Sequence, residues 1–474
     1  MALSPLIILF LLHIPFLCAS LPNLNDTSIS ALDVSESPST GNTRSLWDII
    51  WSCTATLFAC TWTAIHPNIP GMEEGIVTVW SRRLGIMIVA LIAPELIITW
   101  ATLQFLSARG IAKDFNDAFC ARLRQTRGSG HSDIRQSMAT ALLGIPTSDE
   151  RNRQRPSAPH AADRNFREWT VTHGFFAWMG GFMLYVNDEP QATLRPDEIL
   201  SFVRNRSVDV PAIVEADIED RSKGDALSKG IAVLQLAWFV LQLVARLAQN
   251  LPMTLLEIDT LAVAALFSIA YGFWWKKPKD VGRPYAVHWK ATSPPGRLAY
   301  SQASEFLSDK SWFVYLVPFL KPLIGFMGIM VIISPHAVRE HRVPSLGGYN
   351  DHLNGSDNHV ITLFIGCVSG MVFGVIHCLG WNVLFQGHVE QILWRAASLA
   401  IISTPASILL LFCYVIWGTR WTSLGRSVAI ALAASFFIYI VARVTLVVLL
   451  LMSLRSLPPG VYDAVAWTKF FPHF

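Results

Sequence analysis

Long apolar segments recur along the chain and constrain its fold more than any other feature. Each is long enough to cross about 30 Å of hydrocarbon as a helix. Only 15% of the 474 residues are Asp, Glu, Lys or Arg, whereas about a quarter of a soluble protein is charged. The fold class is therefore predicted to be all-α, a polytopic transmembrane helix bundle. The segments are 84–106, 229–249, 253–275, 312–335, 359–385, 396–418 and 427–452.

The N-terminus has the pattern of a secretory signal peptide. An apolar run over residues 3–17 ends in small residues, as it does before a cleavage site. Residues 1–20 are expected to be that peptide, with an uncleaved anchor as the alternative because no Lys or Arg precedes the run. Residues 21–45, rich in Ser, Thr, Asn and Pro, are expected to form a disordered lumenal segment with a glycosylation site at Asn25.

Basic residues gather in loops, and this predicts which side of the membrane each loop faces. Loop 276–311 carries seven Lys and Arg residues, so we expect it to be cytosolic. Loop 336–358 is then lumenal, which suits a second glycosylation site at Asn354. The net charge of +3 provides no strong field that would recruit nucleic acid, so nucleic acid is not an expected partner.

Two shorter segments, 47–66 and 170–186, leave the number of spans open. If Asn25 is lumenal and loop 276–311 is cytosolic, an odd number of spans must separate them. Three longer segments already lie between them, so either both of the shorter segments span or neither does. If both span, the Arg-rich loop 107–168 faces the lumen, against the positive-inside rule. If neither spans, that loop is cytosolic. The prediction is seven to nine spans with a cytosolic C-terminus.

Loop 107–168 separates the first helices, 46–106, from the main transmembrane bundle, 169–474. Its many arginines are interrupted by Pro, Ser and Gly. We expect a basic flexible segment. Contact with anionic lipid head groups or with a partner is the functional interpretation, and a solvated insert is the alternative.

Charged residues inside the predicted spans are the main functional candidates, because an unpaired charge there is costly. Glu95, Lys321 and Arg443 lie about 10 to 17 residues into their spans, near the midplane. Lys321 also lies between Pro318 and Pro322, and such prolines are tolerated where a helix lines a cavity. The three charges are expected to form a substrate or proton pathway, with a buried structural pair as the alternative.

Two further charges lie near the ends of consecutive spans. Arg246 and Glu257 flank a short hairpin that contains Pro252. Because the hairpin turns the chain back on itself, the two side chains are expected to face each other as a structural pair. Asp259 is the remaining charge within a predicted span.

His377 is the titratable residue that the helical pattern places best. It follows Gly366, Gly370 and Gly374, a spacing that lets another helix approach closely. His377 continues the same helix face, so it is expected to point toward a partner helix. Two interpretations stand: a proton carrier or catalytic acid-base, or a histidine hydrogen-bonded within a packed interface.

An acidic stretch precedes the span that starts near residue 229. Asp217, Asp220 and Asp225 could hold Mg²⁺ if the protein acts on a diphosphate, although their spacing differs from that of prenyl-transferring enzymes. A capped helix start is the alternative. No other cofactor is indicated, because motifs for nucleotide binding and for hydrolase chemistry are absent from the sequence.

Four stretches resemble a large family of uncharacterised multi-pass membrane proteins of filamentous, particularly mushroom-forming, fungi. They are WSCTATLFACTWTAIHPNIPG at 51–71, THGFFAWMGGF at 172–182, DRSKGDALSK at 220–229 before LQLAWF, and HCLGWN at 377–382. The resemblance covers most of the chain outside 107–168 and implies a fungal secretory-pathway membrane protein. It carries no activity or catalytic residue, but it draws attention to His66, His173, Asp225, Lys229, His377 and Asn382.

These features favour a secondary transporter or carrier of a small organic molecule. The alternative is a membrane-embedded enzyme that acts on a lipid or isoprenoid intermediate, with His173 or His377 moving protons. The expected partners are the lipid bilayer and a small hydrophobic or organic molecule. The expected location is the endoplasmic reticulum, vacuolar or plasma membrane.

Overall fold

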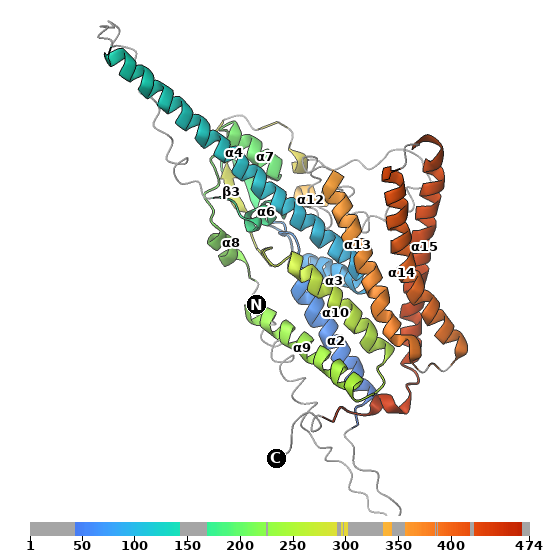
Figure 1. Cartoon of the computed structure of the whole chain (residues 1–474). Helices are drawn as coiled ribbons and strands as arrows, with labels where there is room; N and C mark the ends of the chain where they lie inside the picture. The colour runs from blue at the N-terminus through green and yellow to red at the C-terminus, as the bar shows by residue number, and fades with distance from the viewer. Residues whose placement is uncertain are drawn as a thin grey trace, which may run out of the picture.

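The structure is a computed structural model, and its described part is a helix bundle with a smaller α/β unit at one end (Figure 1). Several sequence predictions fall outside the described residues: the signal peptide 1–20, Asn25, Asp225, the span 312–335 with Lys321, and Asn354. The structure describes residues 43–142 (with side chains to 120), 168–223, 226–291, 295–296, 298–301, 335–343, 356–383, 385, 387–417 and 421–466.

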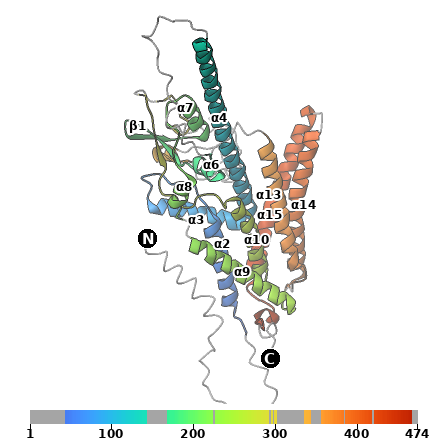
Figure 2. The ribbon, with the colours of Figure 1, turned by 60° about the vertical axis from the view of Figure 1, so that its left-hand side comes forward.

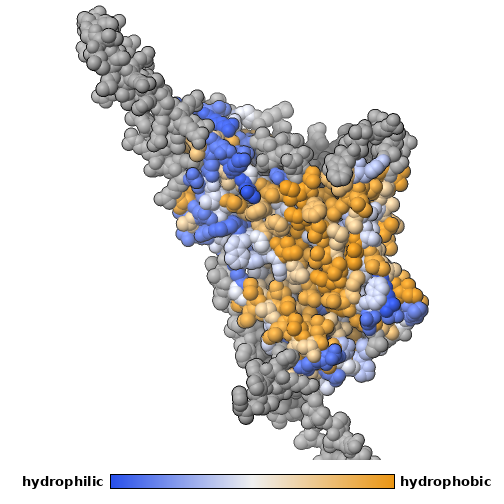
Figure 3. Space-filling view, viewed as in Figure 1, coloured by the Kyte–Doolittle hydropathy of each residue, from blue (hydrophilic) through white to orange (hydrophobic). Residues whose placement is uncertain are grey.

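In the described part of the chain, six helices and the helical segment 94–108 build the bundle, and the six helices lie roughly along one another (Figures 1 and 2). Within the described residues, five helices are long and apolar enough to cross a membrane, or six if the bent pair α3–α4 counts as one span. Figure 3 shows hydrophobic residues gathered in a band over the bundle. By length and composition these are the helices of a multi-pass membrane protein. The bundle consists of α2 (Leu46–Ala64), α9 (Ala226–Ala248), α10 (Leu255–Phe273), α13 (Ser356–His377), α14 (His388–Trp417) and α15 (Trp421–Ser453).

The predicted span 84–106 is not one straight helix. Helix α3 (Ile76–Ile92) and helix α4 (Pro94–Leu142) meet at Ala93 with a bend of 115°. Ala93 has φ −144° and ψ 70°, outside the helical region. The cause is Pro94, because proline disfavours helical geometry in the residue before it and lacks the N–H that would continue the helix.

Segment 170–186 does not span the membrane. It forms the short helix α6 (Val171–Trp178) and the strand β1 (Phe182–Val186). Gly180 between them has φ +91°, a conformation that glycine adopts without a steric penalty. The sequence left this segment open because a fully buried strand and a buried helix have the same composition. The other ambiguous segment, 47–66, forms α2, which packs against α9 and α10.

A three-stranded sheet corrects the all-α prediction: the fold is mostly helical with a small sheet. The order is β2–β1–β3, with β1 antiparallel to β2 (Glu189–Thr193) and parallel to β3 (Tyr285–His288). Asn187 and Asp188 join β1 to β2 with φ values of 53° and 63°, as a two-residue type I′ turn requires.

The sheet belongs to a unit that we call the head, residues 168–223 and 277–301. Its core is separate from that of the bundle and contains Trp178, Phe182 and Leu184. Short helices surround the sheet: α7 (Pro196–Arg204), α8 (Glu215–Arg221) and η1 (Ala299–Ser301), with α12 (Pro335–Arg339) nearby.

The first part of the predicted flexible loop 107–168 is helical, because α4 continues to Leu142. Phe115 and Phe119 on this helix are buried in the head core, and the Phe115 ring stacks on Trp169 with 3.7 Å between centroids. Asn116 also exchanges two hydrogen bonds with the backbone of Trp169, at 2.8 and 2.9 Å. Helix α4 thus extends out of the bundle because the head packs against it.

Both ends of the described chain meet at the end of the bundle away from the head (Figures 1 and 2). The Arg44 N–H donates to the Tyr462 carbonyl at 2.7 Å, and Thr43 pairs with Asp463. Residues this close cannot lie on opposite sides of a membrane. The prediction that combined a lumenal N-terminal segment with a cytosolic C-terminus is therefore wrong, because residues 43–44 and 462–463 lie on the same side.

Candidate functional site

Two of the predicted midplane charges form a buried ion pair. Glu95 lies in the first turn of α4 and Arg443 lies in α15, and Arg443 Nη2 donates to Glu95 Oε2 at 2.7 Å. Glu95 is 8% exposed and Arg443 is 7% exposed. The break at Pro94 brings the start of α4 into the bundle, so the carboxylate reaches α15. Lys321, the third charge of that prediction, lies outside the described residues.

His377 forms a second charged contact between helices. Its Nε2 lies 3.3 Å from Asp259 Oδ1 on α10, and its Nδ1 lies 2.8 Å from the Phe373 carbonyl. Because a carbonyl can only accept, Nδ1 carries a proton and donates it. Nε2 then accepts when the ring is neutral, or donates to the Asp259 carboxylate when the ring is cationic. The His377 side chain is fully buried, whereas that of Asp259 is partly exposed.

One aromatic ring connects the two pairs. The guanidinium carbon of Arg443 lies 3.6 Å from the centroid of Phe373, and the His377 ring stacks on Phe373 at 4.2 Å. A cation over an aromatic face is stabilised by the ring quadrupole. Glu95, Arg443, Phe373, His377 and Asp259 thus form one contiguous group, which we call the buried charge array. It draws side chains from α4, α15, α13 and α10.

The glycines of α13 account for this close assembly. A Cβ on Gly366 would come within 2.5 Å of Thr99 Oγ1 on α4, and a Cβ on Gly374 within 2.6 Å of Ile402 on α14. The face that His377 continues therefore packs against neighbouring helices. His377 itself contacts α10, and its carbonyl accepts from Trp394 Nε1 of α14 at 3.1 Å.

Arg246 and Glu257 lie in one cluster, but they are not each other's ion-pair partners. Glu257 accepts from both terminal nitrogens of Arg44, at 2.5 and 3.2 Å, and caps α10 together with Thr254. Arg246 instead donates to backbone carbonyls, including that of Asp463 at 2.7 Å. The sequence could have revealed the capping box Thr-x-x-Glu. Arg44 was missed because its segment was expected to be disordered.

His173 has a structural role in the head. The Thr170 N–H donates to its Nδ1 at 3.1 Å, so Nε2 carries the proton and donates to the Ile213 carbonyl at 3.2 Å. Burial lowers the pKa of His173, which keeps the ring neutral near neutral pH. Both ring nitrogens are occupied, and neither faces an open site.

The predicted Mg²⁺ ligands are not drawn together. Asp217 caps α8 by accepting from the Val214 N–H at 3.1 Å, and Asp220 lies exposed on the same short helix. Asp225 lies outside the described residues. Among the residues that the structure describes, no three His, Cys, Asp or Glu side chains form a group that could hold a metal ion.

A cluster of buried lysines lies where the bundle meets the head. Lys277 Nζ donates to the carbonyl of His66 and to Gln104 Oε1, at 2.5 and 2.8 Å. Lys279 Nζ donates to the Thr63 carbonyl at 3.0 Å. The Thr63 carbonyl is an orphan acceptor in the last turn of α2, where the helix dipole favours a cation, whereas His66 follows that helix and Gln104 lies on α4. Burial lowers the pKa of Lys279 to about 8 and that of Lys277 well below its usual value. In the sequence, both lysines indicated only which side of the membrane loop 276–311 faces.

Comparison with known proteins places the chain in a family. The family of unknown function DUF8562 matches residues 11–293. The chain belongs to this family. No curated protein and no solved structure matches it.

The DUF8562 range divides the buried charge array. Glu95 and Asp259 lie inside it, whereas Phe373, His377 and Arg443 lie in the helices that follow. The range also contains the head strands and the buried lysines. Each ion pair of the array therefore joins a residue of the family region to a residue of the C-terminal helices.

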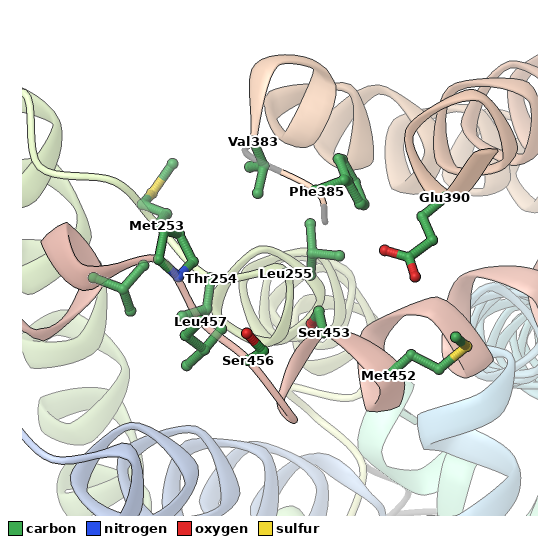
Figure 4. A pocket seen from close by; sticks show the side chains of 12 residues that line it. Met253, Thr254, Leu255, Val383, Phe385, Glu390, Met452, Ser453, Ser456 and Leu457 are labelled. Atoms are coloured by element: carbon green, nitrogen blue, oxygen red, sulfur yellow. The ribbon is translucent and has the colours of Figure 1, made fainter. Parts of the chain in front are cut away.

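A small cavity lies among the residues drawn in Figure 4. Met253 of the α9–α10 connection and Leu255, the first residue of α10, line it, together with Glu390 of α14 and Met452 of α15. Its volume of about 30 Å³ equals the share of one water molecule in the liquid. It is too small for an organic substrate.

Proposed function

We propose that the protein is a secondary carrier of a small organic molecule in a secretory-pathway membrane of a filamentous fungus. The buried charge array couples proton binding to transport. The observation that carries this proposal is the array itself, in which the Glu95–Arg443 ion pair and the His377–Asp259 contact are joined through the ring of Phe373.

The array has the properties of a proton-coupling element. A charge inside a bundle is costly unless it is paired, so paired charges there commonly mark ion or proton pathways. His377 supplies the imidazole of the array, a group that can accept or donate a proton at its ring nitrogens. When its ring is neutral, His377 accepts a hydrogen bond from Asp259 only if that carboxyl group is protonated. When its ring is cationic, His377 forms an ion pair with the Asp259 carboxylate.

The charge change at His377 would be felt by neighbouring helices. A cationic His377 ring and the Arg443 guanidinium both lie against the Phe373 ring, and like charges repel across a low-dielectric interior. The Glu95–Arg443 contact and the His377–Asp259 contact are thus energetically linked. Such a link between α4, α10, α13 and α15 is what a carrier needs to couple protonation to helix rearrangement.

The enzyme alternative receives less support from the described residues. Asp217 is engaged in capping α8, and both ring nitrogens of His173 are bonded within the head. These contacts account for the two residues without a reaction. His377 remains, but it contacts Asp259 and Phe373 rather than an open pocket large enough for a substrate.

The experiment compares small molecules in cells and in medium between a deletion strain and its parent. The carrier proposal expects a compound that is still made but accumulates on one side in the deletion strain. Wild-type protein should restore its distribution and His377→Gln should not. His359→Gln is the matched control, because His359 lies exposed on the same helix.

Two results would overturn the proposal. One is the disappearance of a compound from cells and medium together while a precursor accumulates, which is the result expected of an enzyme. The other is full restoration by His377→Gln in protein that is present at the wild-type level.

A further inference from the structure

An apolar cavity of about 230 Å³ lies between α2, α9 and α10, at the end of the bundle next to the head. The last turn of α2, the last turns of α10 and the first turns of α9 meet there. The cavity arises because α9 packs along α2 and makes little contact with α10. The lining residues used below are Ala232, Val233, Leu236, Phe267, Trp275 and Lys229.

Open space extends around this cavity on both helices. A Cβ on Gly230 of α9 or on Gly272 of α10 would meet no atom within 4 Å. Val233 is 60% exposed and Trp275 is 64% exposed. Both line the cavity and also face outward from the bundle, so the cavity opens sideways toward the hydrocarbon that surrounds α9.

Lys229 is the cationic member of the lining. It lies in the first turn of α9, where the helix dipole is positive and disfavours a cation. Lys277 and Lys279 lie nearby in the buried lysine cluster, and the charge of Lys229 contributes to the lowered pKa of Lys279 and of His66.

Positive charge is in excess at this place. Within the described residues, none of Lys229, Lys277 and Lys279 forms an ion pair with a carboxylate. Among the described residues, Asp280 beside Lys279 pairs with Arg83. Of these lysines, Lys229 lines the apolar cavity near the N-terminal end of α9, and an anion beside it would offset its repulsion from Lys279 and from the helix dipole.

We propose that the cavity binds a single-chain anionic lipid, with its hydrocarbon tail between α9 and α10 and its head group on Lys229. An apolar cavity of about 150 Å³ accommodates benzene, so the larger volume here suits a segment of a linear or isoprenoid chain. Trp275 lies at the rim, where the amphipathic indole ring favours the boundary between hydrocarbon and water.

The chemistry of the site selects among amphiphiles. A neutral alcohol offers no charge to Lys229, and a zwitterion presents a cation that the lysines repel. A fatty acid and an alkyl or prenyl phosphate share the required chemistry, which is an anionic head on one apolar tail. The phosphate carries more charge and more acceptor oxygens, so it should bind more tightly than the carboxylate.

The test measures binding to the purified full chain in neutral detergent by native mass spectrometry. The probes are dodecyl phosphate, dodecanoate, dodecanol and a zwitterionic dodecyl phosphocholine. The expected order is phosphate above carboxylate, with the alcohol and the zwitterion at least about tenfold weaker, since a charged hydrogen bond is worth that factor or more.

Two variants separate the head-group contact from the tail contact. Lys229→Met should weaken the anionic probes about tenfold and leave dodecanol unchanged, while Lys229→Arg retains binding. Ala232→Phe fills the cavity and should weaken every probe. The matched controls are Lys113→Met, an exposed lysine on α4, and Leu234→Phe, on the exposed face of α9.

Equal binding of dodecanol and dodecyl phosphate would overturn the role of Lys229. Unchanged binding in Ala232→Phe would overturn the cavity as the place of the tail. These measurements do not depend on transport, so the binding site can be disproved while the carrier proposal stands, and the reverse also holds.

Discussion

Removing Arg443 tests whether the buried ion pair is structurally required. In Arg443→Met, the Glu95 carboxylate keeps its position at 8% exposure and loses the guanidinium that donates to it at 2.7 Å. Stranding one charge of a buried pair costs about 3–5 kcal/mol. The lost contact between Arg443 and the Phe373 ring, 3.6 Å away, adds about 1 kcal/mol. We therefore expect a loss of about 5 kcal/mol, which is a large share of the stability of an ordinary domain.

The double variant Glu95→Met/Arg443→Met makes the reasoning quantitative. Replacing both members of a buried pair by apolar side chains is often neutral, so only the contact with the Phe373 ring, about 1 kcal/mol, should remain lost. The double variant should then be about 4 kcal/mol more stable than Arg443→Met alone, since the stranded carboxylate is gone. Lys113→Met, at an exposed position of α4, controls for the loss of a positive charge.

The assay is reversible unfolding of the full chain in mixed micelles, with the free energy of unfolding taken from denaturing-detergent titrations. A loss below about 1 kcal/mol in Arg443→Met would mean that the pair contributes little to stability. A double variant that is less stable than Arg443→Met would show that the two side chains act independently. Either result would refute the assignment of Glu95 and Arg443 as an obligatory pair.

Three further outcomes follow from the head and its junction with the bundle. Gly174→Ala should lower the free energy of unfolding by about 1–3 kcal/mol, measured in the same titrations, because a Cβ there would overlap the carbonyl of Ala108 on α4. Lys279, with its pKa lowered to about 8 by burial, loses its proton in the folded state while the unfolded chain still holds it. The free energy of unfolding should therefore rise by about 2 kcal/mol from pH 8 to pH 9.5 relative to Lys279→Met, and a parallel pH dependence of the two proteins would contradict this. A glycosylation acceptor inserted at the 187–188 turn should stay unmodified, whereas one fused after Ala466 should be modified. The reason is that the turn and the C-terminal region lie at opposite ends of the bundle. Modification of both acceptors would contradict this arrangement.

The sequence predicted the long lipid-facing helices well because their apolar composition and length are local properties. Helices α9, α10, α13, α14 and α15 all lie within a predicted span or extend it by several residues. The head was missed for a physical reason. Its strand β1 is buried on both faces, and such a strand has no alternation of polar and apolar residues that would distinguish it from a helix.

The sequence indicated which residues belong to the candidate site better than it indicated which of these residues contact one another. Glu95, Arg443 and His377 were identified because a charged or titratable side chain within a span is costly to bury. The glycine spacing of α13 identified the helix face on which His377 lies. Which charges meet depends on how α3 and α4 bend at Pro94 and on contacts between residues more than a hundred positions apart. The partner of Glu257 is Arg44, 213 residues away. Composition and periodicity carry no information on such contacts.

Helix α4 ties the two parts of the molecule together. Its first turn holds Glu95 in the buried charge array, and Phe115, 20 residues later, lies in the head core. At 1.5 Å per residue these positions are about 30 Å apart along one helix. The close contact of Gly174 with Ala108 fixes the head to α4 between these two positions, nearer to Phe115. A displacement of the first turn of α4 therefore cannot be absorbed by a hinge between bundle and head, because no break interrupts the helix from Pro94 onward. If the array rearranges during transport, the head must move with it or the Gly174 contact must open. If transport persists when residues 108 and 174 are crosslinked, the head moves together with α4. If the crosslink abolishes transport, the contact between Gly174 and Ala108 must open during transport.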